Sequence, residues 1–227
     1  MSALKPWKVS IAEAYAARNE DAIRGYMEYV VEPSMRALTK HAEALAASDD
    51  LATQAFGGIA HRAVIETTSR ALCLGLQSLW EQQLRSILGH WASQQGANRS
   101  IRDQIISNNW NEVASAFEEL RGLPMKSFGA HERLELLRHL GSVCRHGEGR
   151  SARLIRQNHP EWLSPVPDSA IPGPVLVLPV ERLKFLANGI LHFWIELDLL
   201  SMEWLHEKDG GYEVRISYLR NRRSSLA

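Results

Sequence analysis

The chain has few cysteines, no long hydrophobic run and no nucleotide-binding loop, and each absence excludes a class of protein. Its two cysteines, Cys73 and Cys144, lie in helix-patterned segments without the spacing of a disulfide framework, so we interpret them as reduced thiols. No stretch approaches the ~20 apolar residues that cross a bilayer, and the N-terminal sequence MSALKPWKVSIAEAY lacks the apolar core of a signal peptide. We therefore expect a cytoplasmic protein with no membrane association.

Cofactor-binding patterns are also missing. No segment matches GxxxxGK[ST], the loop that binds nucleoside triphosphates. Cys144, His139 and His146 suggest a zinc site, but Cys144 falls on the apolar side of its helix and no second Cys/His cluster lies nearby in the sequence. A Cys144–His146 nucleophile pair fails on the same geometry. We expect no metal and no other cofactor.

The formal net charge is zero, with 26 basic and 26 acidic side chains, but the charge is unevenly placed along the chain. Residues 121–160 carry eight basic and three acidic side chains, whereas the segments on either side are net acidic. A local basic patch on a neutral protein favours a phosphate-bearing partner over a DNA-coating role.

Helical periodicity dominates the chain and predicts an all-α fold. Pro33 is expected to end or kink the first helix, and the Pro-rich connector 164–174 excludes helix. We expect an N-terminal helical extension (1–59), a helical domain (60–207) and a tail (208–227), which together form one compact domain. The predicted helices cover 10–31, 34–48, about 60–95, 101–124 (as one or two helices, stopped by Gly122 and Pro124), a stretch from about Ala130 to His146, and 180–207.

The C-terminal segment YEVRISYL, residues 212–219, breaks this pattern. Its alternation of apolar and polar residues is typical of a strand. Paired with VLVL (175–178), it would give the helical fold a small C-terminal two-stranded β element. Alternatively the strand protrudes, and RNRRSSLA (220–227) is a disordered basic tail.

The stretch LRHLGSVCRHGEGRSARLI, residues 137–155, contains the candidate site. At 100° per residue, the apolar and polar side chains of its helix fall on different faces. The polar face is either the solvated side of an amphipathic helix or a functional site. The apolar face consists of Leu136, Leu137, Leu140, Val143 and Cys144, and the polar face of Glu135, Arg138, His139, Ser142, Arg145 and His146.

The residues after this helix favour an anion site. Gly147 stands where a helix takes a left-handed C-terminal cap, which places His146 in the last turn. After GEG, Ser151 is expected to be the N-cap of a second helix, ARLIRQN. The free N–H groups of its first turn, with Arg150 and Arg153, would form a phosphate seat beside His146. A titratable histidine next to an anion seat suits phosphodiester chemistry.

Three segments resemble the HEPN superfamily of small helical proteins. ALCLGLQSLWEQQLRSILGHW resembles the family's long central helix, and LRHLGSVCRHGEGRSARL resembles its helix-then-loop motif. VLVLPVERLKFLANGILHFWIEL resembles its short extended piece and closing helix. RHGEG is similar to the KHGEG that a group of bacterial proteins in this superfamily carries at this position. The resemblance covers roughly 60–207 and implies a HEPN-like helical bundle.

Many HEPN proteins are metal-independent endoribonucleases of toxin or defence type. Their motif is an arginine, then Asn, Asp or His, and a catalytic histidine with four to six residues between it and the arginine. The resemblance implies that His146 exchanges a proton with a ribose 2′-OH while Arg138, with Arg145 as a second candidate, stabilises the developing charge. Ser142 or His139 would orient the histidine or hold the phosphate. The resemblance also implies RNA as substrate, a homodimer with the site formed across it, and a neutralising or defence-system partner protein.

A second function stays open. Seven residues lie between Arg138 and His146, one more than the family's usual range. This interval and the seven tryptophans favour a non-catalytic helical module that binds RNA or another protein.

Overall fold

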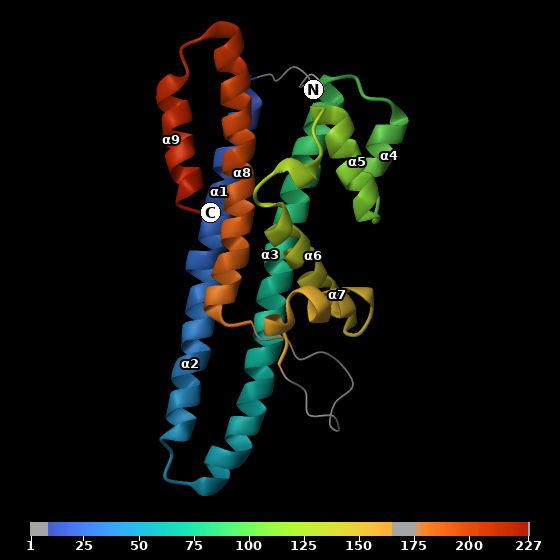
Figure 1. Cartoon of the computed structure of the whole chain (residues 1–227). Coiled ribbons are helices and arrows are strands. Elements are labelled where there is room, and N and C mark those ends of the chain that lie inside the picture. The colour runs from blue at the N-terminus through green and yellow to red at the C-terminus, as the bar shows by residue number, and fades with distance from the viewer. Residues whose placement is uncertain (1–8, 165–175, 177, 227) are drawn as a thin grey trace. The chain divides into compact units, whose positions relative to one another are not determined.

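Helices make up most of the computed structural model, which describes residues 9–164, 176 and 178–226 (Figure 1). Within these residues the only β pairing is a single antiparallel bridge between Leu163 and Leu176. The all-α prediction is therefore confirmed. The helices are α1 (Val9–Tyr26), α2 (Glu32–Ala46), α3 (Gly58–Gln94), α4 (Arg99–Ile106), α5 (Trp110–Arg121), α6 (His131–His146), α7 (Arg150–Asn158), α8 (Val180–Asp209) and α9 (Glu213–Ser224).

Contacts within the chain divide it into two compact units. Unit 1 comprises Met1–Ile23, Ser78–Arg133 and Asn188–Ala227. Unit 2 comprises Arg24–Gln77 and Leu134–Ala187. The long helices α3 and α8 contribute residues to both units, and α6 lies almost entirely in unit 2.

Unit 1 has a core of aromatic side chains from α3, α5, α8 and the segment before α6. Phe193 of α8 is fully buried at the centre of this core. Its ring centroid lies 4.9 to 6.4 Å from four other aromatic rings, which suits offset and edge-to-face packing. These four rings belong to Trp80, Phe117, Phe128 and Trp194.

Several polar groups inside unit 1 are held by hydrogen bonds or by an aromatic face. Trp194 Nε1 donates to Gln83 Oε1 at 2.9 Å, and Gln83 Nε2 donates to the Asn19 carbonyl at 3.1 Å. This chain of bonds connects α8, α3 and α1. The buried Arg121 guanidinium lies 4.5 Å above the Trp91 ring, and burial lowers the pKa of Arg121 to about 9.

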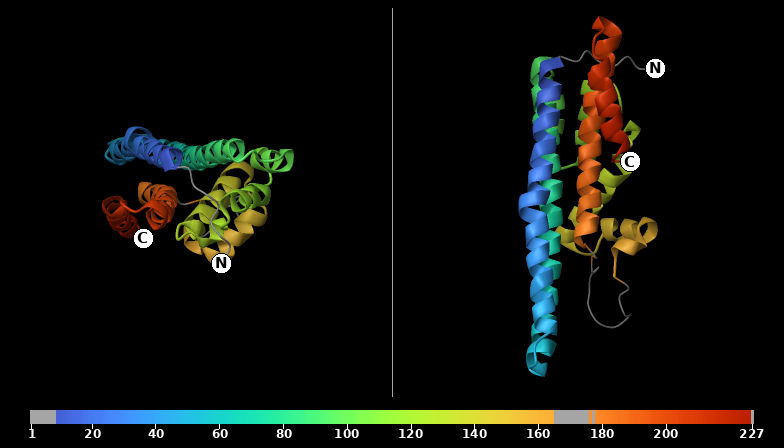
Figure 2. Two further views of the ribbon diagram at one scale, coloured as in Figure 1. Left: turned by 90° about the horizontal axis from the view of Figure 1, so that it is seen from above. Right: turned by 90° about the vertical axis from the view of Figure 1, so that its left-hand side faces the viewer.

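The C-terminal segment is a helix, so the predicted strand over 212–219 and its two-stranded β element are wrong. α9 spans Glu213–Ser224 and folds back along α8 (Figures 1 and 2). Ile216 and Leu219, three residues apart, are both buried in an apolar cluster with side chains of α8. The stabilisation gained by burying this apolar face of the helix against α8 is larger than the local strand preference of the alternating sequence.

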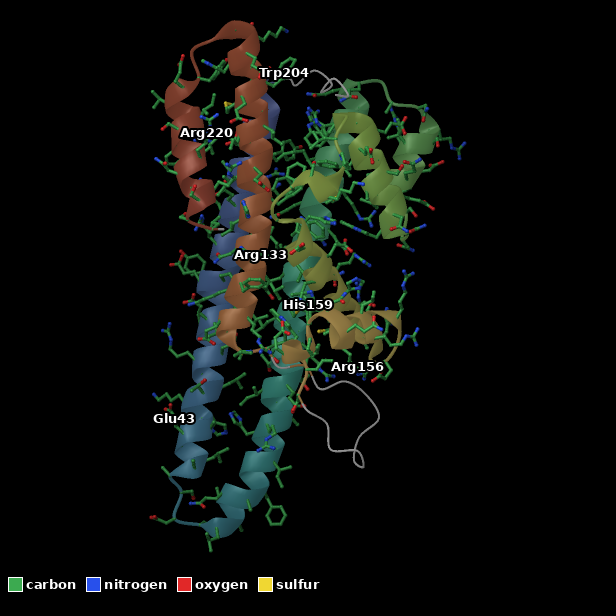
Figure 3. The ribbon with its side chains drawn as sticks, viewed as in Figure 1. Glu43, Arg133, Arg156, His159, Trp204 and Arg220 are labelled. Atoms are coloured by element: carbon green, nitrogen blue, oxygen red, sulfur yellow. The ribbon has the colours of Figure 1, made fainter. Side chains whose placement is uncertain are left out.

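The basic tail is ordered helix through Ser224, which also corrects the alternative of a disordered tail over 220–227. Arg215 of α9 donates from Nη2 to the buried Asp198 Oδ2 of α8 at 2.7 Å. Arg220, which Figure 3 labels on α9, donates to Glu203 Oε1 of α8 at 2.7 Å. These ion pairs hold α9 against α8.

In unit 2, α2 and the first part of α3 run antiparallel and side by side (Figures 1 and 2). His61 Nε2 of α3 lies 2.7 Å from the Leu38 carbonyl oxygen of α2. Tyr26 Oη donates to the Leu72 carbonyl at 3.2 Å. Gly75 allows this approach, because a Cβ at position 75 would collide with the Tyr26 hydroxyl.

Pro33 is preceded by a π-helical turn, Met27–Val31. Proline has no N–H, and in an α-helix its ring collides with the carbonyl four residues earlier, here that of Tyr29. The π turn changes the hydrogen-bond register before Pro33 enters the first turn of α2. Helical backbone therefore continues from Val9 to Ala46, where the sequence predicts separate helices over 10–31 and 34–48.

The Pro-rich connector 164–174 lies outside the described residues except for Ser164. The same holds for Val175 and Val177 of the strand candidate 175–178. The described Leu176 and Leu178 are buried, and Leu176 forms the single bridge to Leu163.

Candidate functional site at the corner between α6 and α7

The two predicted faces of α6 are present in the structure. Its C-terminal cap is also as predicted, since Gly147 has a φ of 68° and its N–H donates to the Val143 carbonyl at 2.8 Å. Cys144 is partly exposed at the edge of the apolar face. The buried residues of α6 are Leu134, Leu136, Leu137, Leu140, Gly141 and Val143.

A chain of side-chain hydrogen bonds connects the polar face of α6 to the first turn of α7. Arg138 donates from Nε and Nη2 to the two carboxylate oxygens of Glu135, at 3.3 and 2.7 Å. Arg138 Nη2 also lies 3.2 Å from His139 Nε2, and His139 Nδ1 lies 3.1 Å from Ser151 Oγ. The structure thus brings together three of the predicted site residues: Arg138, His139 and Ser151.

The direction of these bonds follows from what each group can donate. A guanidinium has no acceptor, so His139 Nε2 must accept the hydrogen from Arg138. The neutral imidazole then carries its hydrogen on Nδ1 and donates it to Ser151 Oγ. Ser151 keeps its own O–H as a donor. The serine is therefore a hydrogen-bond donor for an incoming acceptor, and His139 does not act as its base.

The neutral form of His139 is favoured by its surroundings. The pKa of His139 lies below its ordinary value of 6.5, chiefly because burial removes water from the ring and also because Arg138 lies beside it. Glu135 opposes this shift, while Arg150 and His159 add to it. His139 is thus a neutral hydrogen-bonding element near neutral pH.

We expect the free energy of unfolding to fall as the pH drops below about 6.5, with His139 as one cause. Because the pKa of His139 is lower in the folded state, the unfolded state binds more protons between the two pKa values. The stabilisation is complete above the unfolded pKa and is lost as the pH falls toward the folded pKa. His192 of unit 1 contributes with the same sign, since burial lowers its pKa too.

Urea unfolding at about pH 7.5 and about pH 5.5 measures this effect. His139→Gln should reduce the difference in unfolding free energy between the two pH values, and adding His192→Gln should reduce it further. An unchanged difference in the His139→Gln variant would contradict the assignment of His139 as a neutral group.

Arg145 faces α3 rather than the corner. Its Nη2 donates to Gln77 Oε1 of α3 at 3.1 Å, and its Nε donates to the Gly141 carbonyl at 3.4 Å. Arg145 therefore ties α6 to α3. Among the described residues, neither Ser142 nor His146 has a side-chain hydrogen-bond partner.

His146 is the exposed last residue of α6, eight positions after Arg138. At a rise of ~1.5 Å per residue, the two Cα atoms are about 12 Å apart along the helix axis. The structure does not bring His146 into the Arg138–His139–Ser151 chain.

Ser151 is not the N-cap of α7, which corrects the sequence prediction. The helix begins at Arg150, and Gly149, with a φ of 157°, occupies the capping position. The glycine allows a backbone conformation that places Ser151 in the first turn, where its hydroxyl reaches His139 instead of capping its own helix. Arg150 and Arg153 are both exposed on this first turn, as the phosphate-seat prediction requires.

Three further residues near the corner were not anticipated. Glu148 of the GEG turn accepts from Arg156 Nη1 at 2.9 Å and also pairs with Arg156 Nη2, which fastens the turn to α7. His159 follows α7 as its C-cap residue and lies close enough to His139 to lower its pKa. Arg156 and His159 are labelled in Figure 3. The only sequence signal for the Glu148–Arg156 pair is a basic residue eight positions after a glutamate.

In comparisons with known proteins, no family model, curated protein or solved structure matched this chain. The corner must therefore be interpreted from its own chemistry. Within the described ranges, no group of three or more His, Cys, Asp or Glu side chains is placed to hold a metal ion. No described helix is both long enough and apolar enough to cross a membrane.

Proposed function

We propose that this protein binds the phosphate backbone of RNA at the corner between α6 and α7. The observation that carries the proposal is the bond chain from Arg138 through His139 to Ser151. It fixes the first turn of α7 relative to α6 and leaves the Ser151 O–H as a donor. A polar group held in this way is prepared for a ligand oxygen before the ligand arrives.

The backbone of α7 adds donors at the same place. The first N–H groups of a helix have no partner within the helix, and the helix dipole makes this end favourable for an anion. In α7 these groups belong to Arg150, Ser151 and Ala152. The Ser151 hydroxyl lies in the same turn, so side-chain and backbone donors can bind one phosphate.

The basic side chains around the corner favour an extended polyanion over a single phosphate as the ligand. Arg150 and Arg153 are exposed, and the segment 121–160 has five more basic than acidic side chains. Spaced arginines can neutralise successive phosphates of a nucleic acid strand. RNA is preferred in this proposal because of the HEPN-like sequence order, and the protein is proposed to work as a HEPN-like homodimer.

RNA cleavage is the second candidate function, and the position of His146 favours it. His146 is exposed at the end of α6, and none of the described side chains holds it by a hydrogen bond. It is therefore available to exchange a proton with a 2′-OH. Because Arg138 is about 12 Å away along α6, cleavage would use residues from both subunits of the homodimer.

RNA binding is expected to depend on the arginines of α7. Arg150→Ala/Arg153→Ala should weaken binding of a fluorescent single-stranded RNA at least tenfold at low salt, because two phosphate contacts are lost. The slope of log K against log salt should fall in magnitude by about 1.4, or ~0.7 per phosphate. Fluorescence anisotropy at several salt concentrations measures both quantities.

The matched control is Arg99→Ala/Arg102→Ala, which removes two exposed arginines from the first turn of α4 at the same three-residue spacing. Its RNA affinity should stay within about twofold of wild type. Equal losses in the two double variants would contradict a site at the corner. Incubation of the same RNA with protein in EDTA tests cleavage, which should yield cyclic-phosphate ends that disappear in His146→Ala.

A further inference from the structure

The two cysteines are far apart in the sequence but lie together in unit 2. Cys73 belongs to α3 and is fully buried, whereas Cys144 belongs to α6 and is partly exposed. Both are free thiols, and each lies close enough to the other to shift its pKa. The sequence interpretation of reduced thiols agrees with this state but gives no indication of the pairing.

The packing of α6 on α3 explains why the two cysteines are neighbours. Gly141 lies directly against Gln77, since a Cβ at position 141 would overlap the Gln77 amide. Cys73 is one turn before Gln77 on α3, and Cys144 is about one turn after Gly141 on α6. In an antiparallel crossing these two positions face each other. The glycine therefore permits the close approach that places the cysteines side by side.

The two thiols are chemically unequal. The neighbouring Cys73 thiol is the main cause that lowers the pKa of Cys144. Arg70 and Arg145 lower it further, while burial acts in the opposite direction. The adjacent Cys144 thiol, together with burial, raises the pKa of Cys73. Since the thiolate is the reactive form, Cys144 is the nucleophile of the pair. Cys73 is a buried, protonated thiol next to it.

We propose that Cys144 is a peroxide oxidation site and that Cys73 resolves it to an intrachain disulfide between α6 and α3. In the first step the Cys144 thiolate attacks hydrogen peroxide, which breaks the O–O bond and gives Cys144 sulfenic acid and hydroxide. In the second step the Cys73 sulfur displaces the sulfenic hydroxyl, and the thiol proton leaves with it as water. The peroxide is reduced and the two sulfurs are oxidised.

This site is independent of RNA binding, but it acts on the helix that carries the corner. A disulfide would fasten α6, and with it Arg138 and His139, covalently to α3. Arg70 and Arg145 beside Cys144 favour its thiolate over its neutral thiol. A cysteine with a purely structural role has no use for such stabilisation of the thiolate.

The test begins with reduced wild-type protein and hydrogen peroxide, followed by N-ethylmaleimide under denaturing conditions and mass spectrometry of the intact chain. We expect a loss of two hydrogen atoms, no maleimide label, and a peptide in which Cys73 is linked to Cys144. Dithiothreitol should restore both thiols. Retention of two free thiols while glutathione in the same tube is oxidised would overturn the proposal, as would disulfides between chains.

Two conservative variants separate the roles of the cysteines. Cys73→Ser should accumulate sulfenic acid at Cys144, which dimedone traps, because no resolving thiol is present. Cys144→Ser should lose its remaining thiol about tenfold or more slowly than wild type loses Cys144, because Cys73 is buried and protonated. Equal oxidation rates in Cys144→Ser and wild type would contradict the assignment of Cys144 as the peroxide-reactive residue.

Discussion

Phe193→Ala is expected to lower the free energy of unfolding by about 3–5 kcal/mol. Phe193 has no exposed surface and contacts four aromatic rings, so the substitution removes a large apolar side chain and leaves a cavity among rigid neighbours. Those neighbours come from α3, α5, α8 and the segment before α6. The cavity would therefore loosen the contacts that hold the elements of unit 1 together.

Urea unfolding of purified protein, followed by tryptophan fluorescence and circular dichroism, measures this loss. The control is Phe56→Ala, because Phe56 lies in the connection between α2 and α3 with 75% of its surface exposed. This control should change the unfolding free energy by less than about 0.5 kcal/mol. A loss below about 1 kcal/mol in Phe193→Ala would mean that the ring is not packed as described.

The long helices are the part of the fold that the sequence predicts well. A helix expected over about 60–95 is α3 at Gly58–Gln94, and one expected over 180–207 is α8 at Val180–Asp209. In both, apolar residues recur over many turns, so the helical period is unambiguous and tertiary packing cannot override it. Gly122, with a φ of 78°, ends α5 where expected, because few other residues adopt this backbone conformation readily.

The candidate site could be predicted only in part. The polar face of α6 and its cap at Gly147 depend on periodicity and on one glycine, and both are visible in a sequence. The bond from His139 to Ser151 depends on how the Gly147–Gly149 turn directs α7, which propensity does not determine. The same holds for the Cys73–Cys144 pair, since it depends on where α6 crosses α3.

The error at the C-terminus shows how a short apolar pattern can fit two periods. In YEVRISYL the residues Tyr212, Val214 and Ile216 alternate as in a strand, but Tyr212, Ile216 and Leu219 also follow a helical spacing. A strand would place Ile216 and Leu219 on opposite faces, whereas a helix places them on one face. The structure buries both against α8 and leaves Val214 exposed.

Leu219→Ala is therefore expected to destabilise the protein by about 2–4 kcal/mol, because Leu219 has no exposed surface and fills the cluster between α9 and α8. The strand interpretation, in which Val214 and Ile216 share the buried face, predicts instead that Val214 is the sensitive position. Urea unfolding measures the global effect, and hydrogen exchange of the α9 amides shows whether the helix detaches first.

Val214→Ala is the matched control, on the same helix and with a substitution of the same kind. Val214 is 87% exposed, and alanine has the higher helix propensity, so the unfolding free energy should stay within about 0.5 kcal/mol of wild type. If Val214→Ala were the more destabilising change, every second residue of the segment would have to face the core, as in a strand. The segment could then not be the helix α9. The two substitutions thus decide between the two periods that the sequence alone leaves open.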